Sequence, residues 1–252
     1  MSRALHVLIV DDDPHMADTL ADILDMSGYQ IRAVHSAAEA LKSIRANPPD
    51  CIITDVRMPG MSGFELHAEI RKLGLDIPVV LMTAYAADEA IEDGLNAGVI
   101  GVLTKPLDIQ ALLDFLVFLG KEFRILVVDD DPAFGSSLIE ILKSKGYPAS
   151  QVFKVNEVLD ALTSHTRTIL LDLKLDGENG FEVIPLVRKS YPGLPVVMVT
   201  GYRSEMALLI ENALEQTAFA CLEKPLDILK LMGMLEKIRA MGLKNALKGG
   251  RL

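Results

Sequence analysis

The segment His6–Pro14, with the sequence HVLIVDDDP, is an apolar run that ends abruptly in three acidic residues. It returns later in the chain as Arg124–Pro132, with the sequence RILVVDDDP. Further landmarks recur in the same order and at nearly the same shift, namely Asp55 and Asp172, Thr83 and Thr200, and Lys105–Pro106 and Lys224–Pro225. Because chemically distinct landmarks keep one register, we interpret the chain as two copies of one domain.

Each copy has the pattern of an α/β domain. Short runs rich in valine and isoleucine alternate with longer amphipathic stretches, which is typical of β-α units around a parallel sheet. Continuous apolar strands such as Ile52–Ile53 indicate a sheet that is covered on both faces. In the first copy the predicted strands are Leu5–Val10, Gln30–Val34, Cys51–Thr54, Val79–Met82 and Gly101–Leu103. We therefore predict two (βα)5 doubly wound domains, each a five-stranded parallel sheet in an α/β/α sandwich with five helices.

The length of the chain suits this organisation. Its 252 residues divide into two domains of about 120 residues, each large enough to bury a core. We place the first domain at residues 1–121 and the second at 122–240, with a short basic tail at 241–252 that is interpreted as a frayed helix end or a linker stub. The junction between the copies is short, which leaves little freedom between them.

The helix pattern before this junction, Ile109–Leu119, is apolar nearly all round, whereas a surface helix needs one apolar stripe. We expect it to form an interface, either through tight packing with the second domain or in a homodimer. The alternative is a terminal helix that is simply apolar.

Composition excludes several classes of protein. Half of the residues are apolar, 24% are charged, and the net charge of -10 argues against binding to the phosphate backbone of a nucleic acid. The two cysteines, Cys51 and Cys221, lie inside apolar runs and form no disulfide or zinc pattern. No run approaches the roughly 20 apolar residues of a membrane span, and no signal peptide is recognisable. We predict a cytoplasmic protein with no membrane partner.

The recurring polar residues fall at the carboxyl ends of predicted strands, where an open parallel sheet carries its ligand site. In the first copy they are Asp11 and Asp12 after the first strand, Asp55 after the third, Thr83 after the fourth and Lys105 after the fifth. Clustered carboxylates repel one another unless a divalent cation is bound, and oxygen ligands suit Mg²⁺. A carboxylate can also attack a phosphoryl group, while a metal, an ammonium and a hydroxyl neutralise the transferred oxygens. The set predicts an aspartyl-phosphate site in each copy.

Some of these polar residues also have simpler explanations. Asp13 and Asp131 each precede a proline that opens a helical pattern, so we expect N-caps and not metal ligands there. A single strand-end threonine or a single lysine would be ordinary, but the complete set occurs twice. The histidines His15, His35 and His67 lie in or near amphipathic helix patterns and are expected at the surface.

Both copies resemble the receiver domains of two-component response regulators along nearly their whole length. The resemblance rests on Val10–Asp12, Thr54–Gly63, Leu81–Ala84 and Thr104–Pro106 and on their counterparts in the second copy. It implies a flavodoxin-like fold, similar to that of chemotaxis regulators. It also implies that Asp55 and Asp172 accept a phosphoryl group from a phosphohistidine, carried by a histidine kinase or a histidine phosphotransfer protein.

The resemblance further implies one Mg²⁺ in each domain. In the first copy Asp12, Asp55 and the carbonyl of Arg57 would hold it, with Asp11 helping through water. In the second copy these roles pass to Asp130, Asp172 and the carbonyl of Lys174, with Asp129 in the place of Asp11. The residues expected to contact the phosphoryl oxygens are Thr83 and Lys105 in the first copy, and Thr200 and Lys224 in the second.

The chain departs from the family at four positions. Val102 and Cys221 occupy the position, three before the lysine, where the family often has an aromatic switch residue, so such a switch is not expected. The second copy has Asp176 where the first has Pro59, and Pro185 comes early in its third helix. We expect the loop after Asp172 to be looser or reshaped.

Long side chains flank both candidate sites. Arg57 and Lys174 follow the aspartates by two residues, and Tyr85 and Tyr202 follow the threonines by two. We hypothesise that they cover the phosphoryl group and slow its hydrolysis.

The favoured function is a signalling module with no turnover of its own, an adaptor, relay or phosphate sink that binds a downstream protein. One alternative is a receiver segment of a longer hybrid kinase or output enzyme. Another is an aspartyl-nucleophile phosphatase, which would need an acid two residues after the nucleophile, where Arg57 and Lys174 occur. The last is a structural dimerisation scaffold.

Overall fold

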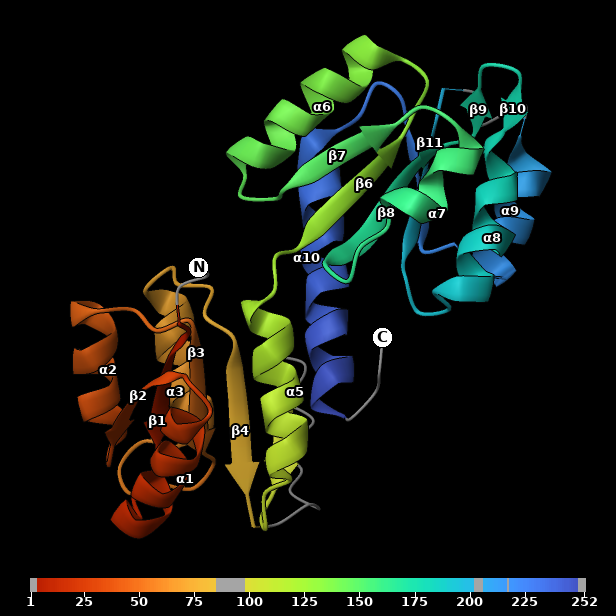
Figure 1. Ribbon diagram of the computed structural model, residues 1–252. Coiled ribbons are helices and arrows are strands. Elements are labelled where there is room, and N and C mark those ends of the chain that lie inside the picture. The colour runs from red at the N-terminus through yellow and green to blue at the C-terminus, as the bar shows by residue number, and fades with distance from the viewer. Residues whose placement is uncertain (1–3, 85–97, 202–205, 217, 249–252) are drawn as a thin grey trace. The chain divides into compact units, whose positions relative to one another are not determined.

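The computed structural model describes residues 4–84, 98–201, 206–216 and 218–248. The chain divides into two compact units, of which the first extends to Gly120 and the second begins at Lys121 (Figure 1). Each unit contains its own five-stranded sheet.

The sheet of the first domain is entirely parallel and has the order β2-β1-β3-β4-β5. Its strands are β1 (His6–Val10), β2 (Gln30–Val34), β3 (Cys51–Asp55), β4 (Val79–Thr83) and β5 (Gly101–Thr104). The described helices are α1 (Pro14–Met26), α2 (Ala37–Ala46), α3 (Gly63–Lys72) and α5 (Ile109–Gly120). The predicted strands are confirmed, and every strand end lies within one residue of its expected place. The helix expected between β4 and β5 falls on residues 85–97, outside the described residues.

The strands of the first domain are buried on both faces. Leu8 and Val10 of β1 belong to an apolar cluster with side chains of α2 and α3, including Ile44 and Leu66. Because side chains alternate along a strand, Val7 and Ile9 point to the opposite face, and they are also fully buried. This burial on both faces explains the continuous apolar runs of the sequence.

The second domain repeats the plan with the sheet order β12-β11-β8-β6-β7, again parallel throughout. Its strands are β6 (Arg124–Val128), β7 (Ala149–Val152), β8 (Thr166–Asp172), β11 (Val196–Thr200) and β12 (Ala220–Glu223). Its helices are α6 (Pro132–Ser144), α7 (Val158–Ala161), α8 (Val183–Ser190), α9 (Ala207–Gln216) and α10 (Ile228–Leu247). Residues 241–247 of the expected tail therefore continue α10 as helix.

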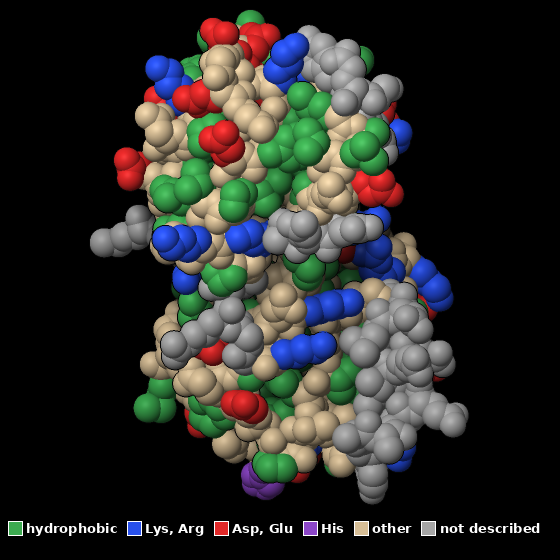
Figure 2. All heavy atoms as spheres, turned by 90° about the vertical axis from the view of Figure 1, so that its right-hand side faces the viewer, with side chains coloured by type: hydrophobic (Ala, Val, Ile, Leu, Met, Phe, Trp, Pro, Cys, Tyr) green, Lys and Arg blue, Asp and Glu red, His purple; other side chains and the backbone are tan. Residues whose placement is uncertain are grey.

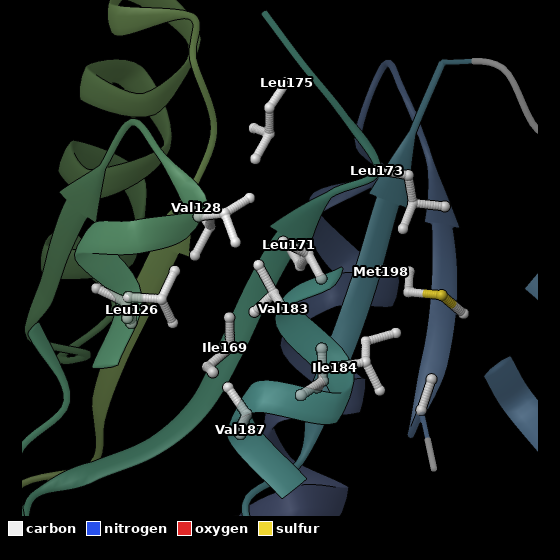
Figure 3. Close-up of a cluster of buried hydrophobic side chains, with 14 of the residues drawn as sticks. Leu126, Val128, Ile169, Leu171, Leu173, Leu175, Val183, Ile184, Val187 and Met198 are labelled. Carbon is white, nitrogen blue, oxygen red and sulfur yellow. The ribbon is translucent and has the colours of Figure 1, made fainter. Parts of the chain in front are cut away.

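Two apolar clusters cover the two faces of the second sheet. On one face, Leu126 and Val128 of β6 share a cluster with Ile169 and Leu171 of β8, and these two lie beside Val183 and Val187 of α8 (Figure 3). The alternate residues of β6 pack with α6 and α10 on the other face, in a cluster that includes Ile125, Val127, Leu138 and Leu231. The three-layer α/β/α prediction is confirmed for both domains.

The loop after Asp172 is reshaped into a small hairpin, as the sequence led us to expect. The strands β9 (Lys174–Leu175) and β10 (Glu178–Asn179) pair antiparallel around Asp176 and Gly177, with Gly177 at a φ of 74°. An Asp-Gly pair suits such a loop because glycine tolerates positive φ. The Glu178 carboxylate accepts a hydrogen bond from the backbone N–H of Val155 at 2.7 Å. The hairpin is thus fixed to the body of the domain.

The prediction that His67 lies at the surface is wrong. His67 is only 4% exposed, whereas His15 and His35 are exposed as expected. His67 lies on the inner stripe of α3 together with Leu66 and Ile70, and this placement overrides the polarity of its ring. Burial lowers the pKa of His67, and the nearby Arg71 lowers it further.

Cys51 is fully buried, and this burial raises the pKa of its thiol, whereas Cys221 is half-buried. Neither cysteine takes part in a disulfide. Within the described part of the chain, none of the helices combines the length and the apolar character of a membrane span.

Candidate functional site

The acidic loop after β1 ends in a helix cap. The backbone N–H of Asp13 donates to Asp11 Oδ1 at 3.0 Å, and Asp13 Oδ1 accepts from the N–H of His15 at 2.9 Å. In the second domain Asp131 makes the equivalent pair of interactions with Asp129 and Ala133. Both helices have proline in their first turn. The N-cap prediction for Asp13 and Asp131 is confirmed, and each cap orients the neighbouring acidic residues.

In the first domain Lys105 joins two buried carboxylates. Its Nζ lies 2.9 Å from Asp11 Oδ2 and 2.6 Å from Asp55 Oδ1. Burial by itself would lower the pKa of Lys105, but its hydrogen bonds and its attraction to both carboxylates outweigh burial and raise the pKa. The lysine therefore stays charged and neutralises carboxylates that are 1% and 8% exposed.

Backbone groups complete the first site. The N–H of Arg57 donates to Asp55 Oδ2 at 2.7 Å, and the N–H of Lys105 donates to the carbonyl of Thr83 at 2.7 Å. Together these elements enclose a pocket of about 240 Å³. It is lined by Asp11, Asp12, Asp13, Asp55, Arg57, Thr83, Ala84 and Lys105. All residues that the sequence assigns to the first site thus come together.

The second domain repeats this geometry. Lys224 Nζ lies 2.8 Å from Asp129 Oδ2 and hydrogen-bonds Asp172 Oδ2 as well. The N–H of Lys174 donates to Asp172 Oδ1 at 3.0 Å, and the N–H of Lys224 donates to the carbonyl of Thr200 at 2.9 Å. The carboxylates outweigh the effect of burial and raise the pKa of Lys224.

The acids of the second site also fit a small divalent cation. Carboxylate oxygens of Asp129, Asp130 and Asp172 all lie within 4.8 Å of one another. Oxygen ligands at such spacing suit Mg²⁺. Among the residues that the structure describes, no other trio of histidine, cysteine or acidic side chains lies as close together. The acids of the first site are therefore more widely spaced. Burial raises the pKa of Asp129 even though Lys224 opposes this effect.

Two glycines belong to the sites although the sequence analysis gave them no role. A β-carbon on Gly63 would collide with the carbonyl oxygen of Asp55, and one on Gly180 would collide with that of Asp172. Close backbone approach is a common reason for glycine at a fixed position. Both follow their aspartates at the same interval, so the repeat itself contained the signal.

At the position where the family often has an aromatic residue, the last strand of each sheet carries Val102 or Cys221. Val102 and Cys221 are half-buried and pack against the apolar clusters of their domains. In the second domain an aromatic ring reaches the lysine from a different element, since the Phe134 ring centroid on α6 lies 4.1 Å from Lys224 Nζ. The side chains of Arg57 and Lys174 are exposed, whereas Tyr85 and Tyr202 lie outside the described residues.

Comparison with known proteins identifies the family. The family model described as response regulator receiver domain matches residues 7–117 and 125–236. A response regulator receiver protein of Anaeromyxobacter sp. (strain Fw109-5) is 31% identical over 231 residues, which cover 92% of this chain and 94% of that protein. The response regulator MprA of Mycobacterium ulcerans (strain Agy99) is 34% identical over 133 residues, or 53% of this chain and 56% of that protein.

Two further matches each cover about half of the chain. The sensor histidine kinase RcsC of Salmonella typhi is 37% identical over 118 residues, which cover 47% of this chain and 12% of the kinase. Among solved structures, a putative response regulator from Chloroflexus aurantiacus is 34% identical with a TM-score of 0.44, covering 47% of this chain and 98% of that one. The chain belongs to the response regulator receiver family, as a tandem of two receiver domains of two-component signalling.

Proposed function

We propose that each domain accepts one phosphoryl group in a Mg²⁺-dependent reaction, on Asp55 in the first domain and on Asp172 in the second. The observation that carries this proposal is the contact of each aspartate with a charged lysine, Lys105 or Lys224, at the carboxyl edge of a parallel sheet. In both domains a second buried acid shares the same lysine.

The reaction is a displacement at phosphorus. An oxygen of the aspartate attacks the phosphoryl group of a phosphohistidine, the P–O bond forms, and the P–N bond breaks with the imidazole as leaving group. Mg²⁺, when bound, would supply positive charge against the negative charge that develops on the phosphoryl oxygens. It would be held by Asp11, Asp12, Asp55 and the carbonyl of Arg57, or by Asp129, Asp130, Asp172 and the carbonyl of Lys174.

The remaining polar groups act on the product. Once a carboxylate oxygen is esterified, the lysine ammonium can pair with the phosphoryl oxygens while it keeps its contact with Asp11 or Asp129. The hydroxyls of Thr83 and Thr200, at the ends of the neighbouring strands, would bind another of these oxygens. The exposed side chains of Arg57 and Lys174 would limit the access of water, so hydrolysis is slow.

The proposed partners are proteins. A histidine kinase or a histidine phosphotransfer protein would donate the phosphoryl group, and a downstream protein would read it. Hydrophobic side chains reach the surface of the second domain (Figure 2), and on α9 Leu208 is 77% exposed. The helix at residues 109–119 remains a proposed interface. The net charge of -10 speaks against nucleic acid as a partner.

The proposed module has no independent turnover and acts in the cytoplasm, with domain limits at residues 1–121 and 122–240. A second candidate, a receiver segment of a longer signalling protein, is favoured by the match to a kinase of which this chain covers 12%. Such a segment would perform the same phosphoryl transfer.

Borohydride reduction tests the proposed sites, because it converts an aspartyl phosphate to homoserine. The protein is incubated with acetyl phosphate and Mg²⁺, reduced and mapped by peptide mass spectrometry, with a sample containing EDTA as control. We expect homoserine at positions 55 and 172, and none in the EDTA sample. Homoserine at other aspartates, or an equal yield with EDTA, would contradict the proposal.

A further inference from the structure

The acidic loop of the second domain is bound by a side chain from a neighbouring strand. Gln151 on β7 donates from Nε2 to the carbonyl of Asp129 at 2.8 Å and to the carbonyl of Asp131 at 3.2 Å. These two carbonyls flank Asp130, one of the three clustered acids. A single amide group therefore fixes both ends of the segment that carries the acids.

A glycine in α6 makes room for this amide. A β-carbon on Gly135 would collide with the side-chain amide of Gln151. Glycine is unfavourable inside a helix, so a buried glycine in α6 indicates a packing requirement. The glycine at position 135 thus leaves the space that the Gln151 amide occupies.

The first domain has a different pair at these positions. Val10 pairs with Val34 in the first sheet, as Val128 pairs with Val152 in the second. This register places Ala33 where the second domain has Gln151, and the aligned repeats place Ala17 where it has Gly135. Alanine has no amide to donate, so this interaction is specific to the second domain.

The two acidic clusters differ accordingly. The three carboxylates of the second site lie within 4.8 Å of one another, whereas those of the first site are not so closely gathered. Groups that orient metal ligands without touching the metal raise affinity, because less ordering is left for the binding step.

We infer that Gln151 is a positioning residue that holds the metal ligands of the second site, so that the second domain binds Mg²⁺ more tightly than the first. This inference rests on the proposed function, because it assumes that both acidic clusters bind the metal. It assigns Gln151 no contact with the metal or the phosphoryl group.

Mn²⁺ titration followed by electron paramagnetic resonance tests the inference, since the signal of free Mn²⁺ reports binding directly. The full chain is used in two backgrounds, Asp12→Asn to isolate the second site and Asp130→Asn to isolate the first. Added Mg²⁺ should displace the bound Mn²⁺. We expect Mn²⁺ to bind the second site about tenfold more tightly, and Gln151→Ala to remove most of this difference.

A second variant separates positioning from folding. Gly135→Ala should displace the Gln151 amide and weaken Mn²⁺ binding, although alanine favours the helix and should not lower the thermal midpoint of the metal-free protein. The converse double variant, Ala17→Gly with Ala33→Gln, should strengthen binding at the first site and leave the second unchanged.

The outcomes are distinguishable. Weaker binding in Gln151→Ala and Gly135→Ala, restricted to the second site, supports the inference. Wild-type affinity in Gln151→Ala, or equal affinities of the two sites, overturns it and leaves the proposed function standing. Absence of Mn²⁺ binding at both sites overturns the inference and the metal-dependent function together.

Discussion

In the second domain the Gln151 side chain on β7 hydrogen-bonds the acidic loop, whereas the first domain has Ala33 at the equivalent position. Glu178 also ties the loop after Asp172 to Val155 in the second domain. The corresponding loop of the first domain contains Pro59 and Gly60 instead. The lysine and its two carboxylates are nevertheless alike in both domains. The comparison supports the proposal that phosphoryl transfer depends on this small common set, whereas the surrounding contacts differ between the domains.

The largest difference between the domains is expected for the glycines beside Asp55 and Asp172. In Gly180→Ala the three atoms nearest to the new β-carbon are backbone atoms of Asp172 and Leu173, whereas in Gly63→Ala two of the three belong to side chains. We expect the free energy of unfolding to fall by about 3 kcal/mol in the second domain for Gly180→Ala and by about 2 kcal/mol in the first domain for Gly63→Ala. Domain-resolved hydrogen exchange measures both, and an equal or reversed order would show that the second backbone relaxes more easily than its packing suggests.

The anchor of the hairpin gives the next largest effect. Glu178→Gln keeps the shape of the side chain but weakens the charge-assisted hydrogen bond to Val155 N–H, which should cost the second domain about 1.5 kcal/mol. The rate of phosphorylation by acetyl phosphate should fall at Asp172 and stay unchanged at Asp55. A fall at both aspartates would disprove the independence of the two sites.

A smaller effect is expected from the ring beside Lys224. Phe134→Met introduces the residue that the first domain has at this place, Met16, and removes a cation–π contact worth about 0.5–1 kcal/mol. The measurement is the rate of phosphorylation of Asp172, with Met16→Leu as the matched control at Asp55. If Phe134→Met leaves the rate at Asp172 unchanged, the ring is a packing contact only.

The smallest expected effect concerns pH. Burial holds the pKa of His67 in the folded domain below its ordinary value of 6.5. As the pH falls through 6.5, His67 is protonated in the unfolded chain before it is protonated in the folded domain, so the free energy of unfolding decreases. Above pH 6.5 the ring is neutral in both states, and this loss of stability is absent. The equivalent position in the second domain is Ile184.

His67→Ile should therefore flatten the dependence of first-domain stability on pH below 6.5 and leave the second domain unaffected. Urea unfolding followed by hydrogen exchange at several pH values is the appropriate measurement. An unchanged slope would mean that other groups cause the dependence.

Much of the fold could be predicted because burial on both faces leaves a plain signal. Strands such as β3 and β4 are continuous apolar runs that end in a polar residue, and the same polar residues form the candidate sites. A reshaped loop was expected because the second copy has Asp176 where the first has Pro59, and the Asp-Gly pair at 176–177 is itself typical of a turn.

The remaining features depend on contacts between distant residues. Gln151 meets Gly135 only because β7 pairs with β6 in one register and α6 follows that strand. His67 was misplaced because its polarity was weighed without the inner stripe of α3, which Leu66 and Ile70 define. The contact between Gln151 and Gly135 leaves no local pattern in the sequence, whereas the helical spacing around His67 contained a usable signal.

Intact mass spectrometry after incubation with acetyl phosphate and Mg²⁺ tests the central claim most directly. The wild-type chain should gain two phosphoryl groups, and Asp55→Asn and Asp172→Asn should each gain one. Two additions in either variant, or none in the wild type, would contradict the assignment of these aspartates as the two phosphoacceptors.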